Sequence, residues 1–182
     1  MRTLAITQNI TLDGAVEMLG DWFDPTTGQD DVLAELHRQD AGSDATLLGR
    51  QTFTDFRGYW PAQTDDTSGI TDYLNRVRKY VVSSTLTDPR WQNSTVLSGD
   101  PITEVMALKE RPGRDIVVTG SITLCHTLIA AGLVDEYRLF GYPVVHGRGR
   151  RLFPDGWSTD RLRLVEATSF RGGVTYQRYA AC

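Results

Sequence analysis

Short apolar runs alternate with amphipathic segments along this chain, and the clearest example is residues 114–139, RDIVVTGSITLCHTLIAAGLVDEYRL. The run at 116–118 is short and β-branched, which is typical of a strand buried on both faces. It stops at Thr-Gly-Ser, and apolar residues then recur at helical spacing over 124–129 until Gly132, where a helix commonly ends. The stretch therefore predicts a strand, a tight polar turn and a helix whose N-terminal amides favour an anion.

The same alternation continues through the rest of the chain. Apolar runs predict strands at residues 3–10, 45–48, 79–82, 95–97 and 133–140, and helical spacing predicts helices at 30–39, at about 102–110 and around Phe53 and Phe56. Residues 20–29 and 60–69 are expected to be loops. Alternating residues on either side of a Gly-Gly turn near the end predict an antiparallel pair. Together these elements predict an α/β three-layer sandwich with a mostly parallel central sheet and an antiparallel C-terminal strand pair.

Length and composition favour a single domain over residues 1–182. A chain of 182 residues that is 40% hydrophobic can bury one sizeable core, and no change in composition divides it. No apolar run approaches membrane-spanning length, and the N-terminus lacks the features of a signal peptide. Cys125 and Cys182 do not make a disulfide framework. We therefore expect a cytoplasmic protein that does not associate with a membrane.

Charge and motif content exclude several other classes of function. The net charge is −4 and the basic residues are mostly scattered, which argues against nucleic acid as a partner. His37, His126 and His146 are far apart and have no ligands at metal spacing, so no metal site is expected. The chain contains no G-x-S-x-G nucleophile motif and no G-x-G-x-x-G dinucleotide fingerprint.

Three predicted strands end alike, in the turns LLGRQT, VVSST and VVTGS. Any one such turn could simply reverse the chain. If the strands are parallel, however, the three turns share the sheet edge at which open α/β sheets bind ligands, and together they favour a dinucleotide. Arg50 beside Ser83 and Ser84 suits a ribose 2′-phosphate, and no acidic residue in these turns could bind a free 2′-hydroxyl. We therefore expect the cofactor to be NADPH and not NADH.

These motifs resemble the dihydrofolate reductase-like fold family, and most closely its branch that contains the RibD C-terminal domain of riboflavin biosynthesis. The resemblance covers nearly the whole chain, and its most specific part is GLVDEYRL followed by PVVHGRGRRLF. It implies an NADPH-dependent reductase that transfers hydride to a small heterocycle such as 5-amino-6-(5-phosphoribosylamino)uracil, with Arg148 or Arg150 as a candidate for the substrate phosphate. It also implies a homodimer.

The resemblance also implies roles for individual residues. Asp13 would be catalytic, near the nicotinamide and the substrate. The residues that would bind the cofactor are Gly49, Arg50, Gln51, Thr52, Ser83, Ser84, Gly120, Ser121, Ile122 and Thr123. By the same resemblance, Gly147 and Gly149 shape a loop on the substrate side. The sequence itself adds aromatic residues as candidates to line the substrate pocket, namely Trp22, Phe23, Phe53 and Trp60. Because the corresponding link in this family is often cis, we expect a cis bond at Thr119-Gly120.

Two alternatives remain open. One is dihydrofolate reductase itself, which carries a carboxylate on its first helix. The matching position here is close to Leu33, and Asp31 and Glu35 are out of register. The other is a non-catalytic nucleotide-binding protein on the same fold, because a fold does not dictate a function.

Overall fold

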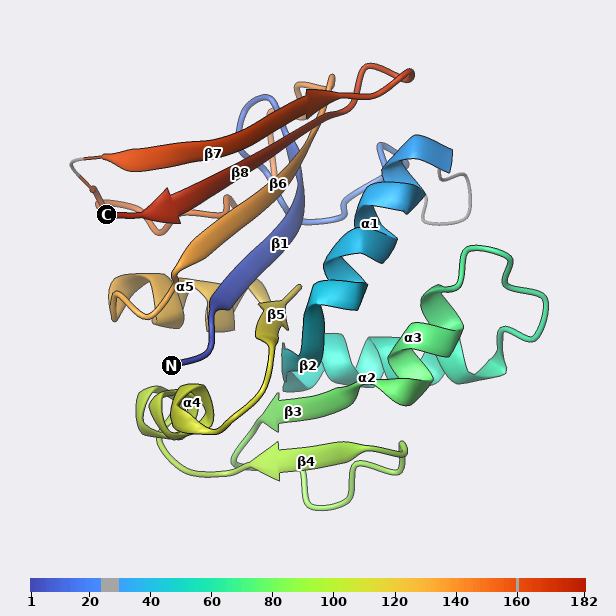
Figure 1. Cartoon of the computed structure of the whole chain (residues 1–182), viewed down its shortest axis with the longest axis vertical. Coiled ribbons are helices and arrows are strands. Elements are labelled where there is room, and N and C mark those ends of the chain that lie inside the picture. Colours follow the sequence, from blue (N-terminus) through green and yellow to red (C-terminus); the bar gives the residue numbers. More distant parts are fainter. Residues whose placement is uncertain (24–29, 160) are drawn as a thin grey trace.

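The computed structural model describes residues 1–23, 30–159 and 161–182. An eight-stranded sheet with the order β4-β3-β2-β5-β1-β6-β8-β7 lies at its centre (Figure 1). Its strands are β1 (Leu4–Thr11), β2 (Ser43–Gly49), β3 (Arg78–Val82), β4 (Ser94–Leu97), β5 (Asp115–Val118), β6 (Glu136–Tyr142), β7 (Leu162–Ser169) and β8 (Thr175–Ala181). The helices are α1 (Asp30–Gly42), α2 (Arg50–Tyr59), α3 (Ile70–Arg76), α4 (Pro101–Glu110) and α5 (Ile122–Ala130), with a 3-10 helix at Trp60–Ala62.

The sheet is parallel from β4 to β6 and antiparallel beyond it. Strands β4, β3, β2, β5, β1 and β6 all pair in parallel with their neighbours, whereas β8 is antiparallel to both β6 and β7. This confirms the predicted mostly parallel sheet with an antiparallel C-terminal pair.

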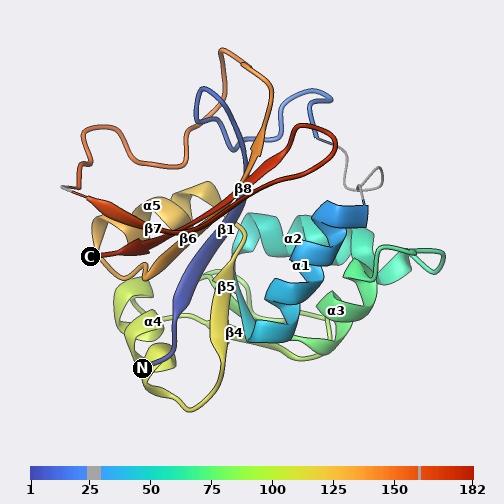
Figure 2. The same cartoon turned by 45° about the horizontal axis from the view of Figure 1, so that its top comes forward.

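Helices cover both faces of the sheet, as Figure 2 shows: α4 and α5 lie on one side, and α1, α2 and α3 lie on the other. Successive residues of β2 show why both sides are apolar. Leu47 packs in a cluster that includes Leu128 of α5, whereas Leu48 packs with Phe53 of α2 and Leu74 of α3. Both leucines are fully buried, as expected for a parallel strand covered on two faces. The predicted three-layer arrangement is therefore confirmed.

Some local features differ from the sequence prediction. Helix α3 was not predicted, and the expected loop at 60–69 contains the 3-10 helix. The cis peptide bond lies between Gly120 and Ser121, so the expectation of a cis bond at Thr119-Gly120 is wrong by one position. No helix within the described residues is long and apolar enough to cross a membrane.

Candidate functional site

The three turns singled out in the sequence leave the sheet at the same edge. Strand β2 lies between β3 and β5 and is parallel to both. Gly49 at the end of β2 is level with Val82 at the end of β3, and Leu47 is level with Val118 at the end of β5. The turns after these strands are therefore neighbours, with the β2 turn in the middle. This is the carboxyl edge at which ligands of open α/β sheets bind.

Two glycines let the β2 and β5 turns come into contact. The Gly49 N–H donates a hydrogen bond to the Gly120 carbonyl over 3.2 Å. A Cβ atom on Gly49 would lie 2.3 Å from Ser121 Oγ, and one on Gly120, whose φ is +149°, would lie 2.8 Å from Thr52 Oγ1. A side chain at either position would therefore push one turn away from the other.

Two helices begin at this contact. Ser121 caps α5 by accepting a hydrogen bond from the Leu124 N–H, whereas Gly49 precedes α2 without any side-chain cap. The first N–H groups of a helix lack intrahelical partners and lie at the positive end of its dipole. Arg50 and Gln51 are exposed at the start of α2, and Arg50 forms no salt bridge with any described residue. The start of α2 therefore presents uncapped amides together with an unpaired cation.

The other residues expected to contact the cofactor occupy different environments. Ser83 is buried, and its hydroxyl accepts a hydrogen bond from the Leu86 N–H, so it stabilises its own turn. Ser84 is exposed beside it. In the first turn of α5, Ile122 packs against the main core and Thr123 is exposed. Ser84 and Thr123 thus leave their side chains accessible, whereas Ser83 and Ile122 have structural contacts.

Asp13 connects the loop after β1 to the loop after β6. Its carboxylate accepts hydrogen bonds from the Thr11 hydroxyl (2.7 Å) and from the N–H groups of His146 (3.0 Å) and Gly147 (2.8 Å). These bonds, that from Thr11 foremost, hold the pKa of Asp13 well below its ordinary value. Asp13 is therefore ionised at neutral pH, and the geometry makes it a residue that positions the loop and is unsuited to donate a proton.

An ion pair between Arg150 and Glu17 also joins the same two loops. Arg150 Nη2 lies 2.6 Å from Glu17 Oε1, and the backbone N–H of Arg150 donates a hydrogen bond to Glu17 Oε2. Gly149 lies beside Glu17, and a Cβ atom at Gly149 would be 3.5 Å from the Glu17 side chain. Arg148 donates from Nε to His146 Nε2 over 3.2 Å. Of the two arginines considered for a substrate phosphate, Arg150 is therefore already paired with a carboxylate.

An aromatic cluster lies near the end of β6. Trp22 and Phe23 both meet Tyr142 edge to face, with ring centroids 5.6 Å and 5.7 Å away. Tyr142 was missed in the sequence because it ends β6 two residues beyond the strand predicted at 133–140. The indole N–H of Trp22 is buried and has no hydrogen-bond partner among the described residues. The cluster therefore forms an apolar wall near the end of β6 with one donor that these residues leave unpaired.

Phe53 and Trp60 belong to the core and do not line this region. Phe53 is completely buried, and Trp60 is only 9% exposed. Both pack with Leu48 under α2, and the Phe53 ring centroid lies 5.8 Å from that of Trp91. The expectation that Phe53 lines a substrate pocket was wrong because the sequence does not reveal which face of α2 points toward the sheet.

The carboxyl edge fits the phosphates of a dinucleotide. Glycines that exclude side chains bring two turns into contact, and the amides at the start of α2 have no side-chain cap. Such an edge can bind anionic oxygens through backbone N–H groups. By contrast, no group of three or more potential metal ligands occurs among the residues that the structure describes.

Comparisons with known proteins point to one family. The chain is 35% identical over 181 residues to the uncharacterized protein YyaP of Bacillus subtilis strain 168, covering 95% of this chain and 92% of YyaP. Its fold resembles a putative riboflavin biosynthesis protein from Shewanella sp. PV-4, with a TM-score of 0.71, 17% identity and 98% of each chain covered. It also resembles a pyrimidine reductase-like protein from Corynebacterium diphtheriae, with a TM-score of 0.69, 18% identity, and 100% and 92% of the two chains covered.

A third similar structure is the diaminohydroxyphosphoribosylaminopyrimidine deaminase/5-amino-6-(5-phosphoribosylamino)uracil reductase of Thermotoga maritima, with a TM-score of 0.68 and 16% identity. The match covers all of this chain but 57% of that longer protein. The family model described as the RibD C-terminal domain matches residues 2–176. The chain therefore belongs to the RibD C-terminal domain family, a family of riboflavin-pathway reductases.

Proposed function

We propose that this protein is an NADPH-dependent reductase that transfers hydride to a small heterocyclic substrate. The observation that carries the proposal is the contact between the β2 and β5 turns, where Gly49 and Gly120 bring the starts of α2 and α5 together. The reductases of this family use a nicotinamide cofactor, which agrees with an edge suited to a dinucleotide.

Each part of the edge has a role in this proposal. The uncapped amides at the start of α2 bind phosphate oxygens, and Arg50 pairs with the ribose 2′-phosphate that distinguishes NADPH from NADH. When bound, the cofactor supplies the hydride. Asp13 keeps the loops after β1 and β6 together beside the substrate, because its carboxylate bonds to amides at both His146 and Gly147.

For the substrate we favour a ribosylaminopyrimidine such as 5-amino-6-(5-phosphoribosylamino)uracil. The Thermotoga maritima protein carries the name of a reductase for this compound, and the two folds superpose over the whole of this chain. The wall formed by Trp22, Phe23 and Tyr142 suits a flat ring, and the buried Trp22 N–H suits a carbonyl group of that ring.

Dihydrofolate reduction is disfavoured by the carboxylates of α1. Asp31 accepts hydrogen bonds from the Val32 and Arg171 N–H groups. Glu35 is paired with Arg38 at 2.8 Å and accepts a hydrogen bond from Gln39. Both carboxylates have structural partners, so neither is free to assist protonation of a pterin.

The test is oxidation of NADPH by the purified protein in the presence of the ribosylaminopyrimidine, with dihydrofolate as a parallel substrate. We expect turnover with the pyrimidine and none with dihydrofolate. Replacing Arg50 by Gln should raise the KM for NADPH by about tenfold and leave the KM for NADH nearly unchanged, because only NADPH has a 2′-phosphate to lose.

Arg163→Gln is the matched control. Arg163 is an exposed arginine on β7, which is the outermost strand on the side of the sheet away from β2. An equal loss of NADPH and NADH binding in Arg50→Gln would refute the cofactor assignment. Binding of NADPH without turnover on any substrate would instead support the non-catalytic alternative.

A further inference from the structure

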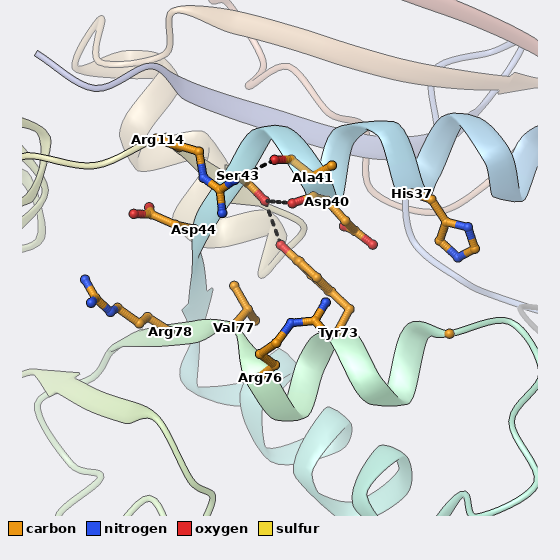
Figure 3. A pocket seen from close by; sticks show the side chains of 11 residues that line it. His37, Asp40, Ala41, Ser43, Asp44, Tyr73, Arg76, Val77, Arg78 and Arg114 are labelled. Carbon is orange, nitrogen blue, oxygen red and sulfur yellow. Dashed lines mark hydrogen bonds between the residues drawn. The ribbon is translucent and has the colours of Figure 1, made fainter.

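A cavity lies at the opposite end of the parallel strands from the candidate site. It has a volume of about 480 Å³ and lies where β2, β3 and β5 begin, between α1 and α3 (Figure 3). We call this end of the sheet, where the three parallel strands begin, the amino edge. The Gly49–Gly120 contact lies where the same strands end, so the length of the strands separates it from the cavity. Small-molecule sites typically occupy about 300 to 1,000 Å³, and this cavity falls within that range.

The cavity gathers positive charge on a chain whose net charge is −4. Arg76 from α3, Arg78 from β3 and Arg114 from the turn before β5 all line it. None of the three forms a salt bridge within the described part of the chain, and Arg114 only donates a hydrogen bond to the Ala41 carbonyl. Three guanidinium groups from separate elements therefore line one cavity, and none of them is paired with a described carboxylate.

Two acidic residues also line the cavity, but they offset this charge only in part. Asp44 is already paired with Arg2, a cation that does not itself line the cavity. Asp40 is half-buried beside Arg76 and His37, and its carboxyl group makes no hydrogen bond with any residue that the structure describes. Burial raises the pKa of Asp40 to about 7, so a substantial fraction of this group is neutral near neutral pH.

The remaining wall combines hydroxyl groups and an aromatic ring. The Tyr73 hydroxyl lies 2.9 Å from Ser43 Oγ, and Ser43 also donates to the Asp40 backbone carbonyl. In Figure 3 these bonds join α3 to the start of β2, and β2 to the end of α1. Tyr73 and Val77 add apolar surface to the lining. The cavity therefore offers cations together with a surface for an uncharged organic group.

We propose that this cavity binds a small phosphate monoester with an organic body, such as a sugar phosphate or a mononucleotide. Guanidinium groups bind phosphate through paired, charge-assisted hydrogen bonds, and a phosphate dianion matches the excess positive charge. A cavity of about 480 Å³ has room for more than the phosphate group alone. The proposal concerns a site separate from the dinucleotide edge and does not rest on the proposed reductase activity.

The test is isothermal titration of the purified protein with ribose 5-phosphate and with AMP. Citrate is titrated as a control anion without a phosphate group, and ribose as a control for the uncharged organic part of the ester. Arg76→Gln and Arg78→Gln remove one cation each, and neither side chain donates a hydrogen bond to another residue in the described part of the chain. Because each variant loses charge-assisted hydrogen bonds to the phosphate, each should bind the esters at least about tenfold more weakly.

Two controls separate this site from the candidate cofactor site. Arg163→Gln should bind both phosphate esters as the unaltered protein does, and Arg50→Gln should bind ribose 5-phosphate as the unaltered protein does. Arg76→Gln should oxidise NADPH at the unaltered rate. The proposal is overturned if neither ester binds, if citrate binds equally well, or if the loss of ribose 5-phosphate binding appears in Arg50→Gln and not in Arg76→Gln. Circular dichroism spectra of each variant establish that it is folded.

Discussion

Asp40 supplies a quantitative test of the electrostatics at the amino edge. Burial raises the pKa of its carboxyl group to about 7 from the ordinary value of 3.8, even though His37 and Arg76 favour the charged form. An acid whose pKa is higher in the folded than in the unfolded protein takes up a proton on folding. Asp40 therefore lowers stability progressively as the pH rises from about 4 to about 7, and the loss is complete above the folded pKa.

The size of this effect can be bounded. Each tenfold change in proton affinity corresponds to about 1.4 kcal/mol, so a rise from 3.8 to about 7 sets a ceiling of about 4 kcal/mol on the free energy lost. Asp40 retains some contact with solvent, which screens the charge and reduces the cost of ionisation. Over the interval from about pH 5 to about pH 8 we therefore expect a loss of about 1 to 2 kcal/mol.

The perturbation is Asp40→Asn, which retains the shape of the side chain and removes its titration. The assay is urea unfolding of the variant and the unaltered protein at about pH 5 and about pH 8. Relative to the unaltered protein, the variant should be more stable at the higher pH by about 1 to 2 kcal/mol beyond any difference at the lower pH. The comparison at each pH removes the contributions of His37, Arg76 and Tyr73, which are present in both proteins.

The control is Asp72→Asn, which removes an exposed carboxylate from the neighbouring helix α3. It changes the net charge by the same amount without altering the cavity. If Asp40→Asn and the unaltered protein keep the same stability difference at both pH values, burial of the Asp40 charge has no energetic cost and the reasoning fails.

Three further predictions concern the carboxyl edge and the core beneath it. In Gly49→Ala the new Cβ atom would lie 2.3 Å from Ser121 Oγ, so the protein should lose about 1 to 3 kcal/mol of unfolding free energy and bind NADPH more weakly in a thermal-shift assay. Unchanged stability and binding would show that the two turns separate freely. Phe53→Ala should cost about 3 to 5 kcal/mol in urea unfolding because it leaves a cavity beneath α2, whereas a loss below about 1 kcal/mol would contradict the core position. Asp13→Asn should speed amide hydrogen exchange at Gly147 at neutral pH, and the difference from the unaltered protein should shrink in acid, where the aspartate itself becomes protonated. Equal exchange rates at neutral pH would remove the positioning role.

The sheet and its ligand-binding edge could be predicted because their signals are local. A β-branched run that stops at a glycine, as at residues 116–120, indicates both a buried strand and its turn. The strand order could not be predicted in this way, because β2 pairs with β5 across more than 60 residues of intervening chain. Without that order, the contact between Gly49 and Ser121 is invisible in the sequence.

Two errors concern helices: the facing of Phe53 depends on tertiary packing, and the apolar pattern of α3 is weak. Phe53 is apolar in a short helix beside a ligand-binding turn, and the sequence alone did not indicate that its side chain points toward Trp91. Helix α3 has few apolar residues in its seven positions, so its period was too weak to detect. Lys79 shows that the burial of a polar residue also depends on tertiary packing. Its side chain is fully buried and donates hydrogen bonds to the Leu74 and Val77 carbonyls near the end of α3.

The two edges of the sheet present anion-binding groups of different kinds, and the difference decides what a mutation at each can reveal. At the carboxyl edge Arg50 is a side-chain donor, but the other donors are backbone amides at the starts of α2 and α5. No substitution removes these amides, although a side chain at Gly49 or Gly120 would displace them. At the amino edge the donors are side chains such as Arg76, each of which can be deleted singly. Loss of binding in Gly49→Ala therefore reports on how closely the turns approach, whereas loss in Arg76→Gln reports on charge. A ligand whose binding responds to Arg76→Gln and not to Gly49→Ala must occupy the amino edge, because the length of the parallel strands separates the two sites.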